Sequence, residues 1–216
     1  MPATPVSGIT LPTTVYKSAR PLPQSLLPAD YFSANRQHSH LALAVMLVLT
    51  QLSAGTFVAG HALVWGPWYD VQMLSTIRPA HALAGLAVAL VGMNAAVFHL
   101  GRPWYAFRAL LGLRTSWLSR EILAFGLFAA FAAANATAVW MASDWPHMIR
   151  VANATGFITA ACGLAATFCS VMIYATTHRP YWSPHRTGPK FFLTAGILGL
   201  PLALLISLAA CALNQN

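Results

Sequence analysis

Five long stretches without an interior charge constrain this chain more than any other feature of its sequence. Each contains about 20 or more mostly apolar residues, the length that an α-helix needs to cross the hydrocarbon core of a bilayer. Their approximate limits are Leu41–Val64, Pro79–Leu100, Glu121–Met141, Val151–Tyr174 and Phe191–Leu213. Charged residues make up only 7% of the 216 residues, far below the roughly 25% of soluble domains. The sequence therefore predicts an integral membrane protein.

The composition of these stretches favours helices over strands. All five are rich in Ala, Leu, Val and Gly, and none shows the strict polar and apolar alternation that is typical of outer-membrane barrels. The predicted fold class is an all-α membrane protein, a bundle of five transmembrane helices with an extended N-terminal arm. We expect the arm to cover residues 1–40 and the bundle 41–216, with helices at approximately 41–64, 79–100, 119–142, 148–176 and 190–213.

The N-terminal arm differs from the rest of the chain. It holds six of the 14 prolines and shows no helical periodicity, so it should be extended or irregular. One interpretation is a disordered tail. Its aromatic residues favour another, because such side chains are scarce in disordered segments. We expect the arm to dock on a neighbouring subunit through Tyr16, Tyr31 and Phe32.

Ten of the twelve basic residues fall on one side of the predicted bundle. These ten are Lys17, Arg20, Arg36, Arg102, Arg108, Arg114, Arg120, Arg179, Arg186 and Lys190. The other side has only Arg78 and Arg150. A net charge of +8 would favour nucleic-acid binding in a soluble protein, but these residues lie between apolar spans, so we expect no nucleic-acid partner. The positive-inside rule predicts a cytoplasmic arm and a periplasmic C-terminus in a bacterial inner membrane.

The cysteines give no indication of a metal site. Cys162, Cys169 and Cys211 all fall within apolar stretches, and no CxxC pair or related spacing is present that could hold zinc or an iron–sulfur cluster. We interpret them as packing residues, and the sequence predicts no metal ligand.

Glu121 is the only glutamate in the chain, and it permits two interpretations. If Ser119 caps the third helix, the acid lies in the first turn, where it offsets the positive helix N-terminus. If the helix instead begins near Thr115 or Ser116, Glu121 lies more than one turn inside. An ionisable group there is costly and usually faces a cavity or pathway.

His99 ends the second apolar stretch on the same side of the membrane as Glu121. An imidazole and a carboxylate at one depth suit a quinone headgroup, whose carbonyl oxygens need hydrogen-bond donors and whose two-electron chemistry moves two protons. Arg102 and Arg120 would supply positive charge nearby. We therefore predict that His99 and Glu121 share a quinone pocket.

Two other classes of function remain open at this point. His61 and His81 lie near one side, and His99 and His178 near the other, a pattern that two b-type haems would need. All four lie close to helix ends, whereas haem ligation needs facing imidazoles at matching depth. The other alternative is a structural or assembly subunit that has no redox site.

The segment HLGRPWYAFRALLGLRTSWLSREI at 99–122 resembles the membrane anchor family of dimethyl sulfoxide reductase. The stretches LTQLSAGTFVAG at 49–60 and YATTHRPYWSPHRTGPKFFLTAGILGLPL at 174–202 resemble it more weakly. The resemblance implies an anchor for a molybdopterin catalytic subunit and a ferredoxin-like iron–sulfur subunit, as in anaerobic respiration. It implies electron exchange with quinone or menaquinone as an exchangeable substrate, with no haem or iron–sulfur cluster in this chain.

The resemblance also implies site residues. The family's quinol-site histidine and glutamate correspond to His99 and Glu121, and Gly101, Arg102 and Pro103 belong to the same motif. We expect the partner to dock beside this motif, at Arg108 and Arg114, and to handle the terminal substrate itself. The family usually has eight spans and this chain has five, so it is a short member or an incomplete chain. Its arm looks like the C-terminal tail of an iron–sulfur subunit joined to an anchor.

Overall fold

The computed structural model of the chain describes residues 41–67, 71–98, 103–177 and 179–213. Several predicted functional residues lie outside these ranges. They are Tyr16, Tyr31, Phe32, His99, Gly101, Arg102 and His178.

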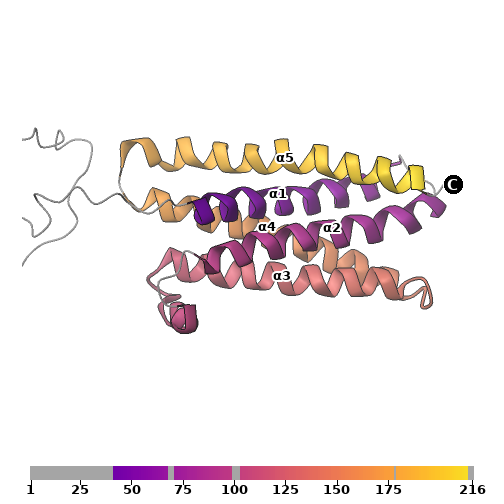
Figure 1. Cartoon of the computed structure of the whole chain (residues 1–216), viewed down its shortest axis with the longest axis horizontal. Coiled ribbons are helices and arrows are strands. Elements are labelled where there is room, and N and C mark those ends of the chain that lie inside the picture. Colours follow the sequence, from indigo (N-terminus) through magenta and orange to yellow (C-terminus); the bar gives the residue numbers. More distant parts are fainter. Residues whose placement is uncertain (1–40, 68–70, 99–102, 178, 214–216) are drawn as a thin grey trace, which may run out of the picture.

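The described residues form helices and the turns between them (Figure 1). The elements are α1 (Leu41–Trp65), α2 (Val71–Val97), η1 (Pro103–Gly112), α3 (Trp117–Met141), α4 (Met148–Ala175), η2 (Pro180–Trp182) and α5 (Pro184–Leu213), where η1 and η2 are 3-10 helices. All five α-helices are long and apolar enough to cross a membrane. The predicted bundle of five transmembrane helices is confirmed.

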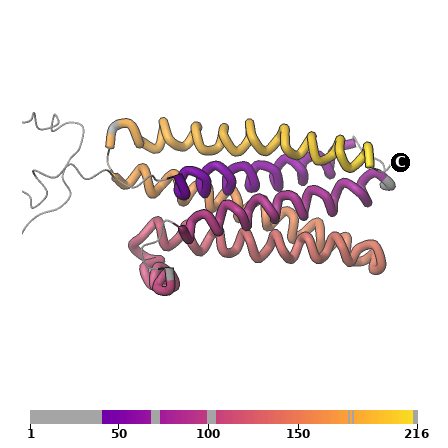
Figure 2. The backbone as a smooth tube through the Cα atoms, viewed as in Figure 1, coloured from indigo at the N-terminus to yellow at the C-terminus, as the bar shows by residue number. Residues whose placement is uncertain are grey.

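The helices run alternately up and down in one elongated bundle (Figure 2). α1 packs against α2, α4 and α5, while α3 packs most extensively against α4. This alternation brings the start of α1, η1 and the turn before α5 to one end of the bundle, here called the arm end (Figure 1). The turn after α3 and the end of α5 lie at the other, the C-terminal end.

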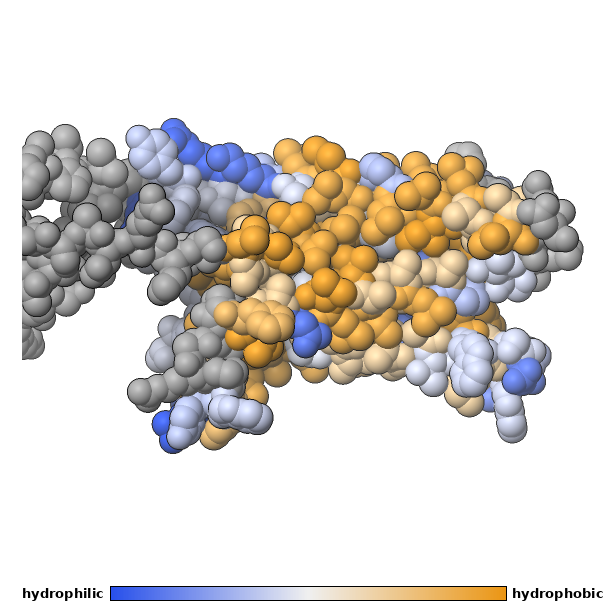
Figure 3. All heavy atoms as spheres, viewed as in Figure 1, coloured by the Kyte–Doolittle hydropathy of each residue, from blue (hydrophilic) through white to orange (hydrophobic). Residues whose placement is uncertain are grey.

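Small residues and aromatic rings fill the centre of the bundle. The main buried apolar cluster consists of Ala54, Phe57, Ala89, Phe125, Phe128, Ala132 and Ala166. Within it, the rings of Phe57 and Phe128 meet edge to face with centroids 5.6 Å apart. The surface visible in Figure 3 is largely apolar along the middle and more hydrophilic toward both ends. That distribution matches a lipid-facing band between two polar membrane surfaces.

Buried hydroxyl groups in the bundle bond mainly to backbone carbonyls. Thr50, Thr56 and Thr167 each donate to the carbonyl four residues earlier in their own helix. Ser53 instead crosses from α1 to α2, where it donates to the carbonyl of Gly85 at 2.7 Å. These bonds leave few polar groups without a partner in a region where lipid offers none.

Two helices begin earlier than their charge-free stretches predict. α2 begins at Val71 rather than 79, and α5 at Pro184 rather than 190. The expected limits were set at the first charged residues, Arg78 and Lys190, but a helix continues past a charge where the side chain reaches the membrane surface or a polar cavity. As a result Arg78 lies inside a helix and not in a loop.

Candidate functional site

The start of α3 determines the depth of Glu121. The N-cap is Ser116, whose side chain accepts from the backbone N–H of Ser119 at 3.4 Å, and the helix begins at Trp117. Ser119 is buried within the first turn and does not cap the helix. The interpretation of Glu121 as a first-turn acid after Ser119 is therefore wrong, and the acid lies beyond the first turn.

Glu121 is buried, with 6% of its surface exposed. Its Oε1 accepts a hydrogen bond from the hydroxyl of Ser170 on α4. Ser170 Oγ also lies 3.2 Å from the carbonyl of Ala166, so its single proton is shared between two acceptors. Among the described residues, Glu121 forms no ion pair.

Arg120 does not neutralise Glu121, although it is adjacent in sequence. Its Nε donates to the carbonyl of Leu113 at 2.9 Å and its Nη2 to that of Arg114 at 2.9 Å. Its guanidinium lies 4.3 Å from the centre of the Trp117 ring. Arg120 therefore holds the loop between η1 and α3 against the start of the helix.

Aromatic side chains surround the arm end near the level of Glu121. Trp117 meets Phe168 edge to face at 5.9 Å. The Tyr174 ring lies 5.1 Å from that of Trp182 and 5.6 Å from that of Phe191. Such rings are enriched at the boundary between hydrocarbon and headgroups, so the buried acid lies close to a membrane surface.

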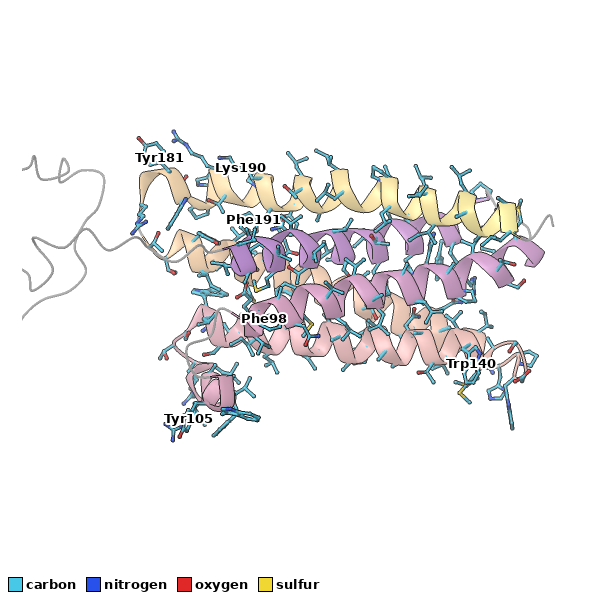
Figure 4. All side chains as sticks on the ribbon, in the orientation of Figure 1. Phe98, Tyr105, Trp140, Tyr181, Lys190 and Phe191 are labelled. Atoms are coloured by element: carbon cyan, nitrogen blue, oxygen red, sulfur yellow. The ribbon has the colours of Figure 1, made fainter. Side chains whose placement is uncertain are left out.

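η1 stands away from the bundle at the same end (Figures 1 and 4). It exposes large apolar side chains, with Trp104 at 89% and Leu111 at 85% of their surface. Arg108, a predicted docking residue, is exposed and stacks on Tyr105 at 4.8 Å. η1 begins at Pro103, the last residue of the predicted quinone motif. An exposed helix of this composition suits contact with a lipid surface or a partner subunit.

The opposite end of the bundle contains a polar cavity that sequence reasoning missed. It has a volume of about 50 Å³ and is lined by His61, Arg78, His81, Asn135 and Asn153 among other residues. These residues come from α1 to α4. In the sequence only His61 and His81 were related to each other, as an alternative pair of haem ligands, and no pattern joined Arg78 or the two asparagines to them. The assignment of Arg78 to a loop hid the only charged member.

The cavity bears on the alternative in which His61 and His81 bind haem. His81 Nε2 lies 2.9 Å from the carbonyl of Ala203 and 3.0 Å from the hydroxyl of Ser207, so this nitrogen is already hydrogen-bonded. The cavity is also well below the roughly 300–1,000 Å³ of typical cofactor sites. In this conformation these two histidines do not form an open ligand pair. His99 and His178, the other pair, lie outside the described residues.

The structure therefore describes only part of the predicted quinone site. Glu121 is placed within α3 and Pro103 at the start of η1, while His99, Gly101 and Arg102 lie outside the described residues. Their approach to Glu121 stays a prediction. Ser170, which holds the carboxylate, was not predicted because no sequence signal sets the register of α4 against α3.

Comparison with known proteins agrees with the resemblance carried by the motifs. Residues 35–215 match the family described as DMSO reductase anchor subunit (DmsC). The protein is 31% identical to a sulfite dehydrogenase subunit of Allochromatium vinosum over an alignment of 182 residues, which covers 76% of this sequence and 54% of that protein. It is 32% identical to a subunit of the anaerobic dimethyl sulfoxide reductase of Haemophilus influenzae over 119 residues, which are 55% of this sequence and 41% of that protein.

The chain thus spans about half the length of the curated relatives that it matches. No solved structure matches it. The family match covers all five membrane-spanning helices, including the segment from His99 to Glu121. On this basis, the chain belongs to the family of DMSO reductase anchor subunits (DmsC).

Proposed function

We propose that this protein anchors an oxidoreductase complex to the bacterial inner membrane and exchanges electrons between the quinone pool and an iron–sulfur partner subunit. The observation that carries the proposal is Glu121, a buried carboxyl without an ion pair among the described residues, located beyond the first turn of a spanning helix. An ionisable group in such a place is expensive for the bundle. A role in proton transfer explains why a carboxyl is found there.

The chemistry follows from what a quinol must lose. Oxidation of a quinol to a quinone releases two electrons and two protons, and the electrons leave for the partner's iron–sulfur cluster. The Glu121 carboxylate accepts a hydrogen bond and then the proton of one quinol hydroxyl, while the imidazole of His99 accepts the proton of the other. The Ser170 hydroxyl keeps the carboxylate oriented in both states. The reverse sequence reduces a quinone with the same groups.

The arm end is the side on which the partner docks in this proposal. It carries Arg108 of η1, Arg114 of the loop that follows, and Lys190 of α5, together with the exposed rings of η1 (Figure 4). Positive charge with aromatic residues favours a protein interface. The partner is a ferredoxin-like iron–sulfur subunit, which in turn holds a molybdopterin catalytic subunit. The names of the relatives, a sulfite dehydrogenase and a DMSO reductase, support a complex of this class.

The positive-inside rule puts this end in the cytoplasm. A reporter enzyme fused after Asn216 should then be active as a periplasmic protein, and one fused within the arm as a cytoplasmic protein. If protease added outside intact spheroplasts removes the arm, the orientation is the opposite one, and the proposed quinone site lies at the outer face.

The proposal is tested by Glu121→Gln in the assembled complex. The amide keeps the size of the side chain but cannot accept a proton, so quinol-dependent turnover should fall at least tenfold, since general acid–base groups typically contribute 10²–10⁴-fold. The matched control is Asp144→Asn, the same chemical change at an exposed residue of the turn after α3. It should leave turnover unchanged.

Assembly is measured separately, as the amount of catalytic subunit bound to membranes. Normal assembly with slow turnover in Glu121→Gln supports the quinone role. If a double variant with Glu121→Gln and His99→Ala keeps wild-type quinone turnover, the protein is a structural anchor only, and the proposed site is wrong.

A further inference from the structure

The polar cavity at the C-terminal end contains nitrogen atoms that the described part of the protein leaves without partners. His61 Nε2, Arg78 Nε and His81 Nδ1 are all buried and form no hydrogen bond there. His81 is itself only 8% exposed. Buried polar atoms in native proteins are almost always satisfied by protein or ordered water, so three such atoms around one cavity indicate that water or a ligand occupies it.

Of the residues that line this cavity, Arg78 has the strongest need for a partner. Its guanidinium is always charged, and the one hydrogen bond that it forms within the described residues runs from Nη1 to the amide oxygen of Asn153, at 3.2 Å. Of the described acids, neither Glu121 nor Asp144 pairs with it. Arg78 follows the first residue of α2 by seven positions, about 10 Å along the helix. A charge at that depth is costly unless an anion or water reaches it.

The cavity adjoins a larger and more apolar groove between α2, α3 and α4. This groove has a volume of about 390 Å³, and Arg78 and Val139 line both spaces. Its other lining residues are Leu74, Ser75, Pro79, Trp140, Ala142, Ser143 and Ile149. Trp140 lies at the C-terminal end and is 76% exposed (Figure 4). The groove therefore runs from the membrane surface to the guanidinium.

The charge of Arg78 and the apolar walls of the groove together indicate which ligand fits. A quinone is neutral and supplies no counter-charge to Arg78. A free inorganic anion supplies charge but leaves the apolar groove without a partner. A phospholipid supplies both, because Nε and Nη2 of an arginine form a fork that matches two phosphate oxygens, and an acyl chain covers apolar walls.

We propose that this groove binds one anionic phospholipid, with its phosphate on Arg78 and an acyl chain along Leu74, Val139 and Ile149. Ser75 and Ser143 lie at the rim beside the glycerol region. The site lies at the end opposite the proposed quinone pocket and does not depend on that proposal. Its ligand class is a diacyl glycerophospholipid with a net negative headgroup.

The test is native mass spectrometry of the full chain in mild detergent, after incubation with equimolar phosphatidylglycerol and phosphatidylcholine of the same acyl chains. Wild type should retain phosphatidylglycerol with at least a tenfold preference. Arg78→Gln should reduce the preference to about onefold. The matched control is Arg150→Gln, which removes the other described basic residue of this end, one that does not line the groove. It should keep the preference.

A second variant keeps the test decisive if Arg78→Gln fails to fold. Ala142→Phe fills the groove and leaves the guanidinium intact, so phosphatidylglycerol retention should fall at least fivefold. Asp70 precedes α2 outside the described residues, and Asp70→Asn should leave retention unchanged. A rise in retention would identify that carboxylate as the native partner of Arg78 and overturn the proposal.

Three further outcomes would also overturn it. Equal retention of both lipids by wild type means that charge does not select the ligand. No retention of either lipid means that the cavity holds water only. The third outcome is a thermal stabilisation by inorganic phosphate alone that equals the stabilisation by phosphatidylglycerol. If Arg78→Gln abolishes this stabilisation, the site binds a free oxyanion.

Discussion

Substitution of Gly199 by alanine should separate α1 from α5. The two helices meet backbone to backbone where Gly55 faces Gly199, and a Cβ on Gly199 would lie 2.5 Å from both the Cα of Gly55 and the backbone nitrogen of Thr56. Real Cβ atoms essentially never come closer than 3.0 Å. The obstructing atoms are backbone atoms, which cannot rotate away, so the helices themselves must move apart.

The net cost is the difference between two opposed terms. Overpacking of this kind destabilises by about 1–3 kcal/mol, and alanine recovers up to about 1 kcal/mol of helix propensity relative to glycine. Because the obstructing atoms are backbone atoms, the upper part of that range applies, about 2–3 kcal/mol, and Gly199→Ala should lower the free energy of unfolding by about 1–2 kcal/mol. That loss corresponds to a factor of about 5–30 in the unfolding equilibrium.

Gly196→Ala is the matched control, on the same helix three residues earlier. A Cβ at Gly196 meets no atom within 4 Å, so only the propensity term remains, and stability should rise by about 0.5–1 kcal/mol. The assay is equilibrium unfolding by SDS in mixed micelles, followed by circular dichroism. If Gly199→Ala unfolds at the same SDS fraction as Gly196→Ala, or at a higher one, the close helix contact is wrong.

The same unfolding assay checks three further substitutions. Phe128→Ala should cost about 3–5 kcal/mol, because the ring is fully buried at the centre of the main cluster; a loss below about 1 kcal/mol would contradict that location. Gly60→Ala should cost up to about 2 kcal/mol after the gain in helix propensity, because its Cβ would lie 2.5 Å from the Nδ1 of His81, and the same substitution should cost little in a His81→Ala background. Ser53→Ala removes the bond to the Gly85 carbonyl and should cost about 0.6 kcal/mol, the mean for such bonds in a membrane bundle.

The number and order of the spanning helices could be predicted because the information is local. A span needs a run of about 20 residues without charge, and each such run is visible in the sequence whatever it packs against. The predicted limits of α2 and α5 were less accurate, because they too were read from the local sequence alone. A charge was taken as the end of a span, whereas Arg78 lies within α2 and Lys190 within α5.

The candidate site was only partly predictable because its contacts join distant segments. The depth of Glu121 depends on whether Ser116 or Ser119 caps α3, and both serines are acceptable caps in sequence. Ser170 is 49 residues from Glu121, and only the packing of α3 on α4 brings them together. The polar cavity is lined by residues of four helices, so no single pattern along the chain predicts it.

Glu121 and Arg78 are too far apart to stabilise each other. Val139 lines the cavity of Arg78 and follows Glu121 by eighteen residues on α3, about 27 Å along the helix. At that separation, with an effective dielectric constant of about 20, two unit charges attract by only about 0.6 kcal/mol. Glu121 must therefore be stabilised locally by Ser170 and by what enters the arm end, and Arg78 by Asn153 and by what enters the groove.

Since sites so far apart without shared partners have additive effects within about 0.5 kcal/mol, Glu121→Gln should leave lipid retention unchanged and Arg78→Gln should leave quinol turnover unchanged. A loss of both activities in either single variant would mean that the two ends are coupled through the packing of α2 against α3, and that neither site acts alone.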